Sequence, residues 1–308
     1  MKDKLVTLIG GGGFLGRYVA QELLARGARV RIAQRRPRDA WFLKPLGGLG
    51  QTQFVAADLT VPETIANAVA GSDAVVNLVG TFKTDAFHAV HVKGAQTAAI
   101  AASRAGASGF VQVSAIGADP ESPSGYGKSK ADGERVVREA FRAATILRPS
   151  ILFGREDKFV NRFAGMIAGK PVVPVLRGKA RFQPAWVADA GMAVANALSD
   201  TLAHGGQTYE LGGPDILSMA ELFRWIAHEI GADPAFVDLP DPIGALIPML
   251  PGSPITGDQW RMLKQDNLVA PGAKGFAALG IDPTPLAAVA PGWLVQYRRH
   301  GRFGKLAA

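Results

Sequence analysis

The chain has 308 residues, of which 48% are hydrophobic and 19% charged, so it can form one large or two smaller folded domains. It contains no cysteine, which excludes disulfide frameworks, cysteine-ligated metal centres and thiol catalysis. Lysine and arginine exceed aspartate and glutamate by 8, and this basic balance indicates an anionic partner such as a phosphorylated small molecule, a nucleic acid or a membrane surface.

The amino-terminal residues lead directly into a β-branched stretch at 5–9, without the apolar region and cleavage site of a signal peptide. The longest uncharged stretches, 242–257 and 283–297, are short and interrupted by prolines, so neither is expected to span a bilayer. We therefore expect a cytoplasmic protein that is soluble or peripheral on the inner face of the cytoplasmic membrane.

The first half of the chain alternates short β-branched runs with amphipathic segments, which is typical of a parallel, doubly wound sheet. Helices are expected at 14–26 and 85–105, each followed by glycine. Strands are expected at 5–9, 30–33, 53–56, 74–79, 110–114 and 145–147.

After Pro149 the pattern loosens, and the expected helices 187–198 and 219–230 lie among proline-rich loops. The predicted fold class is therefore α/β: a Rossmann-type doubly wound parallel sheet with a smaller C-terminal lobe. We assign residues 1–215 to the nucleotide-binding domain, with its core at 1–150, and residues 216–308 to a lobe for a substrate or partner.

A glycine-rich loop, residues 10–16, follows the first expected strand and opens the first expected helix. In this context glycines allow a tight turn, close approach of backbone N–H groups to a pyrophosphate, and packing of helix on strand. A flexible turn without a ligand is the alternative interpretation. The predicted cofactor contacts in this loop are Gly10, Gly13, Phe14, Leu15 and Gly16.

The end of the second expected strand indicates which dinucleotide is bound. An NAD-selective site places an acidic residue there to hold the ribose 2′-hydroxyl, whereas this chain has Gln34, Arg35 and Arg36. An arginine can pair with a 2′-phosphate through two hydrogen bonds, so NADP(H) is favoured over NAD(H), with Arg35 and Arg36 as its ligands. A solvated turn is the alternative for these arginines.

Two further strand ends are expected beside the cofactor. Asp58 and Leu59 follow the third strand, near the adenine, although Asp58 is equally compatible with a role in a turn. Leu78, Val79 and Gly80 end the fourth strand against the cofactor.

Tyr126 and Lys130 are four residues apart, a spacing that puts both on one face of a helix. An ammonium group beside a phenol lowers the pKa of the phenol, which would make Tyr126 an acid or base for hydride transfer to or from a carbonyl. A surface tyrosine beside a solvated lysine is the alternative.

The glycine loop, the Tyr126-x-x-x-Lys130 pair and residues 147–154 together resemble an extended or atypical short-chain dehydrogenase/reductase, related to NAD-dependent epimerases and dehydratases. Residues 113–119, 182–189 and 258–267 resemble the family of the NADPH-binding accessory subunit of respiratory complex I and its bacterial relatives. The resemblance covers nearly the whole chain and is looser in the last third. It implies that Ser114, Tyr126, Lys130 and Pro149 also line the cofactor site and that Ser114, Tyr126 and Lys130 form the catalytic group.

Two departures from the dehydrogenase pattern leave two functions open. Ala115 or Ile116 stands where active relatives have a second Ser or Thr, and His91 stands where they have an Asn. The first function is a nucleotide-binding protein associated with complex I or quinone metabolism, in which the nucleotide is a structural or sensing ligand. The second is an active reductase, epimerase or dehydratase that uses Tyr126 and Lys130 on a lipophilic carbonyl or nucleotide-sugar-like substrate.

No metal site or specific nucleic-acid module is predicted, since His88 and His91 form the only helical histidine pair and basic residues are not interleaved with aromatics. The basic excess concentrates at 26–44 (+6) and 283–308 (+4). The second region has apolar residues at near-helical spacing before its basic cluster, so it is expected either to dock on a membrane or on complex I or to pack on its own lobe. These apolar residues are Leu286, Val289, Trp293, Leu294 and Tyr297.

Overall fold

The computed structural model describes residues 1–249, 253, 255–299 and 301, which form two compact units. Unit 1 comprises Met1–Pro149, Val187–Leu211 and Ala270–Asp282, and unit 2 comprises Ser150–Trp186, Gly212–Val269 and the chain from Pro283. This division differs from the consecutive ranges predicted, because 150–186 packs with the later lobe whereas 270–282 returns to the first unit.

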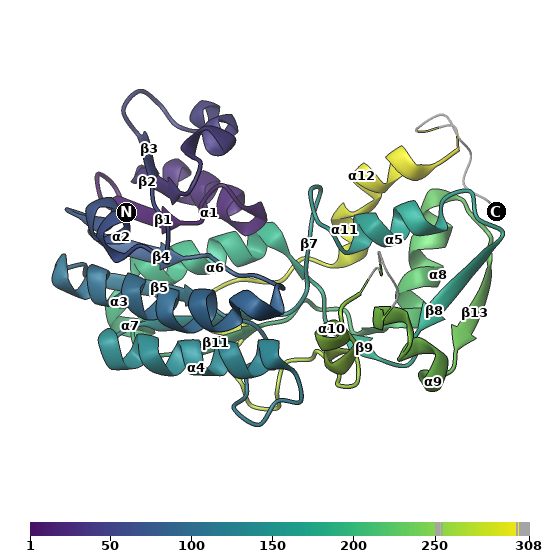
Figure 1. Cartoon of the computed structure of the whole chain (residues 1–308). Coiled ribbons are helices and arrows are strands. Elements are labelled where there is room, and N and C mark those ends of the chain that lie inside the picture. Colours follow the sequence, from purple (N-terminus) through teal and green to yellow (C-terminus); the bar gives the residue numbers. More distant parts are fainter. Residues whose placement is uncertain (250–252, 254, 300, 302–308) are drawn as a thin grey trace. The chain divides into compact units, whose positions relative to one another are not determined.

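Unit 1 is built on a seven-stranded sheet in the order β11-β6-β5-β4-β1-β2-β3, in which every pairing is parallel (Figure 1). The strand order reverses between β1 and β4, whose carboxyl ends adjoin in the register Ile9 to Asn77. Such a reversal is where dinucleotides bind in doubly wound sheets. The strands are β1 (Leu5–Ile9), β2 (Arg29–Gln34), β3 (Thr52–Ala56), β4 (Ala74–Asn77), β5 (Gly109–Val113), β6 (Thr145–Pro149) and β11 (Thr208–Leu211).

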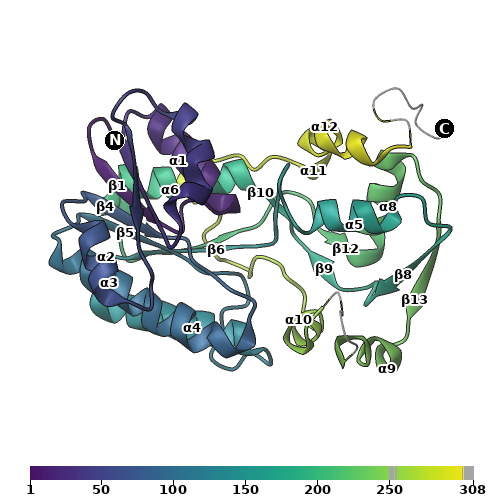
Figure 2. The same ribbon diagram turned by 45° about the horizontal axis from the view of Figure 1, so that its top comes forward.

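Helices cover both faces of this sheet, which explains why its central strands are buried and apolar on both sides (Figure 2). On one face, α1 (Phe14–Ala25) packs against α6 (Val187–Ser199), and Gly191 permits close approach, since a Cβ there would lie 3.0 Å from the Tyr18 backbone. The other face carries α2 (Pro62–Val69), α3 (Ala95–Arg104) and α4 (Gly125–Ala140). The predicted Rossmann-type class is confirmed.

The helix expected at 85–105 is interrupted. It consists of a 3-10 turn at Thr84–Ala86, a π-helical turn at His88–Gly94 and then α3. Gly133 of α4 lies directly against this turn, because a Cβ on Gly133 would lie 2.2 Å from the His91 carbonyl oxygen. The π turn therefore packs against α4 at His91, a contact that hydrophobic periodicity does not predict.

An ion-pair network holds α4 against the sheet. Arg148 of β6 donates to Glu134 of α4 at 2.7 Å and to Glu210 of β11 at 3.2 Å. These carboxylates, Glu134 first, raise the pKa of Arg148, so its charge is permanent. Glu210 also accepts a hydrogen bond from the Ala270 N–H at 2.8 Å. The network fixes the helix that contains Tyr126 and Lys130.

Unit 2 has its own apolar core and three two-stranded sheets, two of them parallel. Helix α8 (Met219–Ile230) has the predicted bounds: Ser218 and Glu221 form a capping box, and Gly231 ends it with φ 66°. The sheets pair β7 (Leu152–Phe153) with β10 (Ala185–Trp186), β8 (Val172–Leu176) with β13 (Ala235–Leu239), and β9 (Arg181–Phe182) with β12 (Leu217–Ser218).

The remaining elements are short. Unit 1 also contains the 3-10 helices η1 (Pro37–Leu46) and η5 (Phe276–Leu279) and helix α7 (Thr201–His204). Unit 2 also contains α5 (Val160–Ile167), α9 (Asp241–Gly244), η4 (Ile247–Met249), α10 (Gly257–Met262), α11 (Leu286–Val289), α12 (Pro291–Leu294) and η6 (Val295–Tyr297).

The apolar stripe of the C-terminal segment faces the core of unit 2. Leu286 and Leu294 are fully buried there, and Trp293 and Tyr297 pack against the same cluster. This stripe is therefore not free to dock on a membrane or on complex I, and the packing alternative holds. Of the basic residues that follow, Arg298 donates to the Glu229 carbonyl at 2.9 Å, while His300, Arg302 and Lys305 lie outside the described residues.

Among the helices that the structure describes, none has both the length and the hydropathy needed to cross a bilayer.

Candidate functional site

The glycine loop turns sharply between β1 and α1. Gly10 has φ 81°, and its N–H donates to the Ala33 carbonyl at 2.8 Å. A Cβ on Gly16 would lie 2.4 Å from the Gly11 carbonyl oxygen, so only glycine allows α1 to start this close to the strand. In the described structure no side chain caps the N-terminus of α1 and its first turn has no acidic residue. This terminus therefore favours an anion.

Gln34, at the end of β2, is bound to the glycine loop. Its Oε1 accepts a hydrogen bond from the Gly12 N–H at 3.0 Å, and its Nε2 donates to the Arg36 carbonyl at 2.7 Å. A Cβ on Gly12 would lie 2.1 Å from Oε1, so a side chain at position 12 would displace the Gln34 amide. A neutral amide thus occupies the position where NAD-selective sites place a carboxylate.

The two arginines after Gln34 differ in their surroundings. Both are exposed, and Arg36 forms an ion pair with Asp39 at 3.1 Å. Arg35 lies toward Asp58, whose pKa is lowered by hydrogen bonds from Thr60 and, to a smaller extent, by the Arg35 charge. Arg35 is therefore the better placed of the two for a phosphate beside β2.

The strand ends predicted to lie beside the cofactor adjoin the loop. A Cβ on Gly10 would lie 2.8 Å from Val79 Cγ2. The Asp58 carboxylate accepts both the N–H and the hydroxyl of Thr60, at 2.9 and 2.8 Å, so its side chain forms a turn. Leu59 is buried in the core of unit 1, and Leu78 donates its N–H to the Ile9 carbonyl at 3.0 Å.

Lys130 is buried beneath the predicted site, 6% exposed. Its ammonium donates to the Val113 carbonyl at 3.3 Å and lies 5.7 Å from the centre of the Tyr126 ring. Burial lowers the pKa of Lys130 to about 8, an effect that the Glu134 carboxylate partly offsets. A Cβ on Gly80 would lie 3.5 Å from Nζ, so this ammonium lies next to the end of β4.

Tyr126 is surrounded by rings. Phe82 stacks on it with centroids 4.9 Å apart, and Phe87 and His91 present their edges at 5.9 and 5.4 Å. Burial raises the pKa of Tyr126 above its ordinary value. This direction is opposite to the prediction that Lys130 makes the phenol more acidic, and its cause is desolvation of the phenolate.

His91 connects the segment after β4 with α4. Its Nε2 accepts the Thr81 N–H at 3.0 Å, so Nδ1 carries the proton and donates to Ser129 Oγ at 2.9 Å. Ser129 in turn donates to the Tyr126 carbonyl at 2.9 Å. Burial, assisted by the Lys130 charge, lowers the pKa of His91 to about 3, which keeps the ring neutral. The sequence analysis identified His91 as standing where active relatives have an Asn, but it did not predict this chain of hydrogen bonds.

Ser114 directly follows β5 and has an unsatisfied hydroxyl. It is 4% exposed, and its Oγ has no hydrogen-bond partner within the described structure. A buried unpaired hydroxyl costs about 1–3 kcal/mol, and a hydrogen bond to a polar ligand group would offset this cost. Pro149 lies beside it, where its carbonyl accepts the Ile116 N–H at 3.1 Å, and neither Ala115 nor Ile116 supplies the second hydroxyl of active dehydrogenases.

The residues present fit a dinucleotide. The glycine cradle, the uncapped N-terminus of α1, the buried ammonium of Lys130 and the unpaired hydroxyl of Ser114 all belong to unit 1. Sequence reasoning missed Phe82, Phe87 and Ser129, although Phe82 lies two residues after Gly80, which is predicted to contact the cofactor.

Comparisons with known proteins agree with this geometry. The NAD(P)H-binding family model matches residues 10–162. The "NADH dehydrogenase [ubiquinone] 1 alpha subcomplex subunit 9, mitochondrial" of Arabidopsis thaliana is 33% identical, over 96% of this chain and 79% of that protein. A ceramide reductase of Caulobacter vibrioides is 31% identical, over 92% of this chain and 87% of that protein.

Among solved structures, the chain is similar to an NADPH-dependent quinone oxidoreductase of Escherichia coli complexed with NADPH. The TM-score is 0.76 at 20% identity, and the match covers 94% of this chain and 99% of that one. At this level of identity the similarity shows the fold.

The buried charge of Lys130 gives a prediction about stability. Replacing Lys130 with methionine should raise the free energy of unfolding of the nucleotide-free protein at pH 7 by about 2 kcal/mol, because the charged ammonium no longer has to be desolvated. The native pKa lies near 8, below the ordinary 10.5, so wild type gains stability as pH rises through this window and the advantage of the variant should shrink. Urea unfolding at pH 7 and pH 10 measures both effects.

The exposed Lys128 on the same helix supplies the control, since Lys128→Met should change the free energy of unfolding by less than about 0.5 kcal/mol. The Lys130 variant should also bind nucleotide more weakly, because a buried charge that lowers stability often contributes to ligand binding. A Lys130→Met protein with a lower free energy of unfolding than wild type would contradict this account. A higher free energy of unfolding whose difference from wild type does not vary with pH would contradict it as well.

Proposed function

The chain belongs to the NAD(P)H-binding, atypical short-chain dehydrogenase/reductase family of the complex I accessory subunit, and we propose that it binds NADP(H) as a mainly structural or sensing ligand. We further propose that it associates with respiratory complex I or acts in quinone metabolism. The C-terminal basic residues are not needed for this proposal, which depends on unit 1.

The surroundings of Tyr126 support a binding role over a catalytic one. Three rings pack around the phenol and its pKa is raised, whereas an efficient acid–base catalyst has a pKa near the working pH. The positions after Ser114 supply no second hydroxyl for a substrate oxygen. Loss of one such donor typically costs several kcal/mol in a transition state but little in cofactor binding.

The preference for NADP(H) is supported by the end of β2. Gln34 is neutral and bound to Gly12, and Arg35 is exposed beside it, so the site has no carboxylate to repel a 2′-phosphate at this position. The association with complex I is supported by relatives in a plant, a slime mould and rodents that are named NADH dehydrogenase [ubiquinone] 1 alpha subcomplex subunit 9. Their sequences are 32–35% identical to this chain.

Nucleotide titration tests the role of Arg35. NADPH should bind at least about tenfold more tightly than NADH, and Arg35→Gln should remove most of that difference by weakening NADPH alone. Isothermal titration calorimetry measures the four affinities. Arg38→Gln, which removes a nearby exposed charge of the same kind, should leave them within about twofold. Equal affinities of wild type for NADPH and NADH would refute the assignment.

Native purification tests the association. Membranes of the native host, solubilised gently and separated by native electrophoresis, should contain the chain in the complex I band. Denaturation of that band should release NADP(H), because a structural ligand stays bound through purification. Absence of the chain from an active complex I band would contradict the association, and an empty chain within the band would contradict the structural role of the nucleotide.

A second candidate, an NADP(H)-dependent reductase of a lipophilic carbonyl, is favoured by the unpaired buried hydroxyl of Ser114. The relative named ceramide reductase points in the same direction. In this function the reduced nicotinamide supplies the hydride. Tyr126, kept protonated by its raised pKa, donates its hydroxyl proton to the carbonyl oxygen, and Lys130 stabilises the phenolate that remains.

Turnover separates the two candidates. If long-chain ketones support NADPH oxidation, Tyr126→Phe should lower kcat at least about 100-fold and leave NADPH affinity within twofold, since only the proton donor is lost. Absorbance at the nicotinamide band measures the rate. Activity retained by Tyr126→Phe would exclude the phenol as the donor. Wild type that binds NADPH but turns over no ketone supports the structural role.

A further inference from the structure

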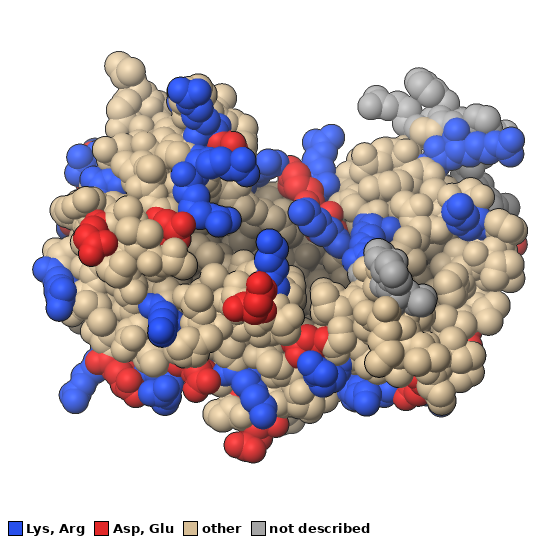
Figure 3. Space-filling model, viewed as in Figure 1, with Lys and Arg blue, Asp and Glu red and all other residues tan. Residues whose placement is uncertain are grey.

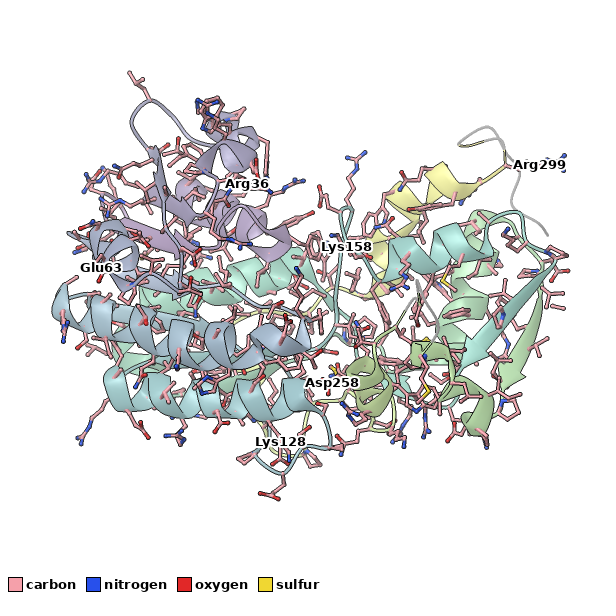
Figure 4. All side chains as sticks on the ribbon, in the orientation of Figure 1. Arg36, Glu63, Lys128, Lys158, Asp258 and Arg299 are labelled. Carbon is pink, nitrogen blue, oxygen red and sulfur yellow. The ribbon has the colours of Figure 1, made fainter. Side chains whose placement is uncertain are left out.

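The connection between β2 and β3 forms an exposed basic and aromatic surface on unit 1. We call it the 36–49 ridge, and it projects beyond the sheet in Figures 1 and 2. Figure 3 shows lysine and arginine side chains gathered over it, and Figure 4 shows Arg36 at its start. Its exposed side chains are Arg36, Arg38, Asp39, Trp41, Phe42, Lys44, Pro45, Leu46 and Leu49.

The exposure of the two aromatic rings is imposed by the fold. In η1, Ala40 and Leu43 are fully buried, which fixes the helix on unit 1 and leaves Trp41 and Phe42 outward at 46% and 44% exposure. Adjacent exposed Trp and Phe side chains on a well-anchored helix are costly in water. They therefore indicate a surface that is covered in the cell.

Cations lie directly on these rings. Lys44 Nζ is 4.0 Å and the Arg38 guanidinium 5.6 Å from the Trp41 ring centre, and the Arg17 guanidinium is 4.4 Å from that of Phe42. Each ring thus carries a positive charge at its face. The partner must accept apolar rings and several cations within one small area.

The tip of the ridge adds an apolar side chain with nothing around it. Leu49 is fully exposed between Gly48 and Gly50, and Gly50 has φ 78°. A leucine at a glycine-rich turn can enter an apolar layer without disturbing the core of unit 1.

Charge and shape identify the partner class. The only carboxylate on the ridge, Asp39, is already paired with Arg36, so the surface is complementary to anions. A projecting ridge also suits a flat surface, whereas peptide segments usually bind in grooves. Tryptophan with basic neighbours and an apolar tip is the composition of segments that lie in the headgroup region of bilayers.

We infer that the 36–49 ridge is a membrane-surface anchor that binds bilayers containing anionic lipid. Trp41, Phe42 and Leu49 enter the headgroup boundary, and the cations on the ridge contact lipid phosphates. This inference does not depend on the proposed function, and it places membrane contact on unit 1 instead of the C-terminal segment.

Vesicle sedimentation tests the anchor with the full chain. The protein should sediment with phosphatidylcholine vesicles that contain phosphatidylglycerol, much less with phosphatidylcholine alone, and less as salt is raised. Arg38→Gln/Lys44→Gln should weaken binding about 25-fold, from roughly fivefold per basic residue. Leu49→Ser should weaken it about tenfold, because one leucine no longer leaves water.

Matched controls use exposed residues of unit 1 outside the ridge. Leu202→Ser removes a leucine that is 98% exposed, and Lys2→Gln/Arg104→Gln removes two exposed charges; both should bind vesicles as wild type does. An unchanged midpoint of urea unfolding in every variant shows that the chain is folded.

Three outcomes would overturn the anchor. One is wild type that does not sediment with the anionic vesicles, and another is ridge variants that bind as tightly as the controls. The third is a photocrosslinker at position 49 that, in native cells, forms adducts with protein and none with lipid, since a protein then covers the ridge.

Discussion

The burial of the Lys130 ammonium is the constraint that organises the site. A charge this deeply buried requires α4 to be held firmly, and the Glu134–Arg148–Glu210 network does so by joining the helix to β6 and β11. Glu134 also partly offsets the cost to Lys130 itself. A substitution that neutralised Arg148 would leave two largely buried carboxylates unpaired and would also loosen the helix. The stability of the fold and the position of the functional ammonium thus depend on the same contacts.

The same buried charge decides the states of its neighbours. His91 stays neutral partly because Lys130 is charged, and a neutral ring with a fixed tautomer can hold Thr81 and Ser129 together. Desolvation among the rings raises the pKa of Tyr126. These contacts support the proposal of a nucleotide-binding role, and the unpaired Ser114 hydroxyl supports the alternative of a reductase.

Local patterns predicted much of the fold, and tertiary contacts account for the rest. The strand 5–9 and the helix 219–230 have the predicted bounds because their hydrophobic periodicity and helix caps depend only on residues close together in the sequence. The π turn around His91 depends on Gly133, forty-two residues later, and the return of 270–282 to unit 1 depends on Glu210. Similarly, the sign of the Tyr126 pKa shift depends on Phe82 and Phe87, which spacing alone does not bring together.

The basic cluster at 26–44 separates into three roles once its contacts are known. Arg26 pairs with Glu22, and Arg31 donates to the carbonyls of Ala68 and Ala70, so these two serve the fold. Arg35 follows Gln34, which is bonded to the glycine loop, whereas the arginines and lysine of the 36–49 ridge are exposed. The cofactor and the anionic surface would therefore be bound by neighbouring cations on one strand end. A 2′-phosphate beside Arg35 lowers the local positive potential, so nucleotide and membrane occupancy are expected to oppose one another weakly, by an amount that falls as salt is raised.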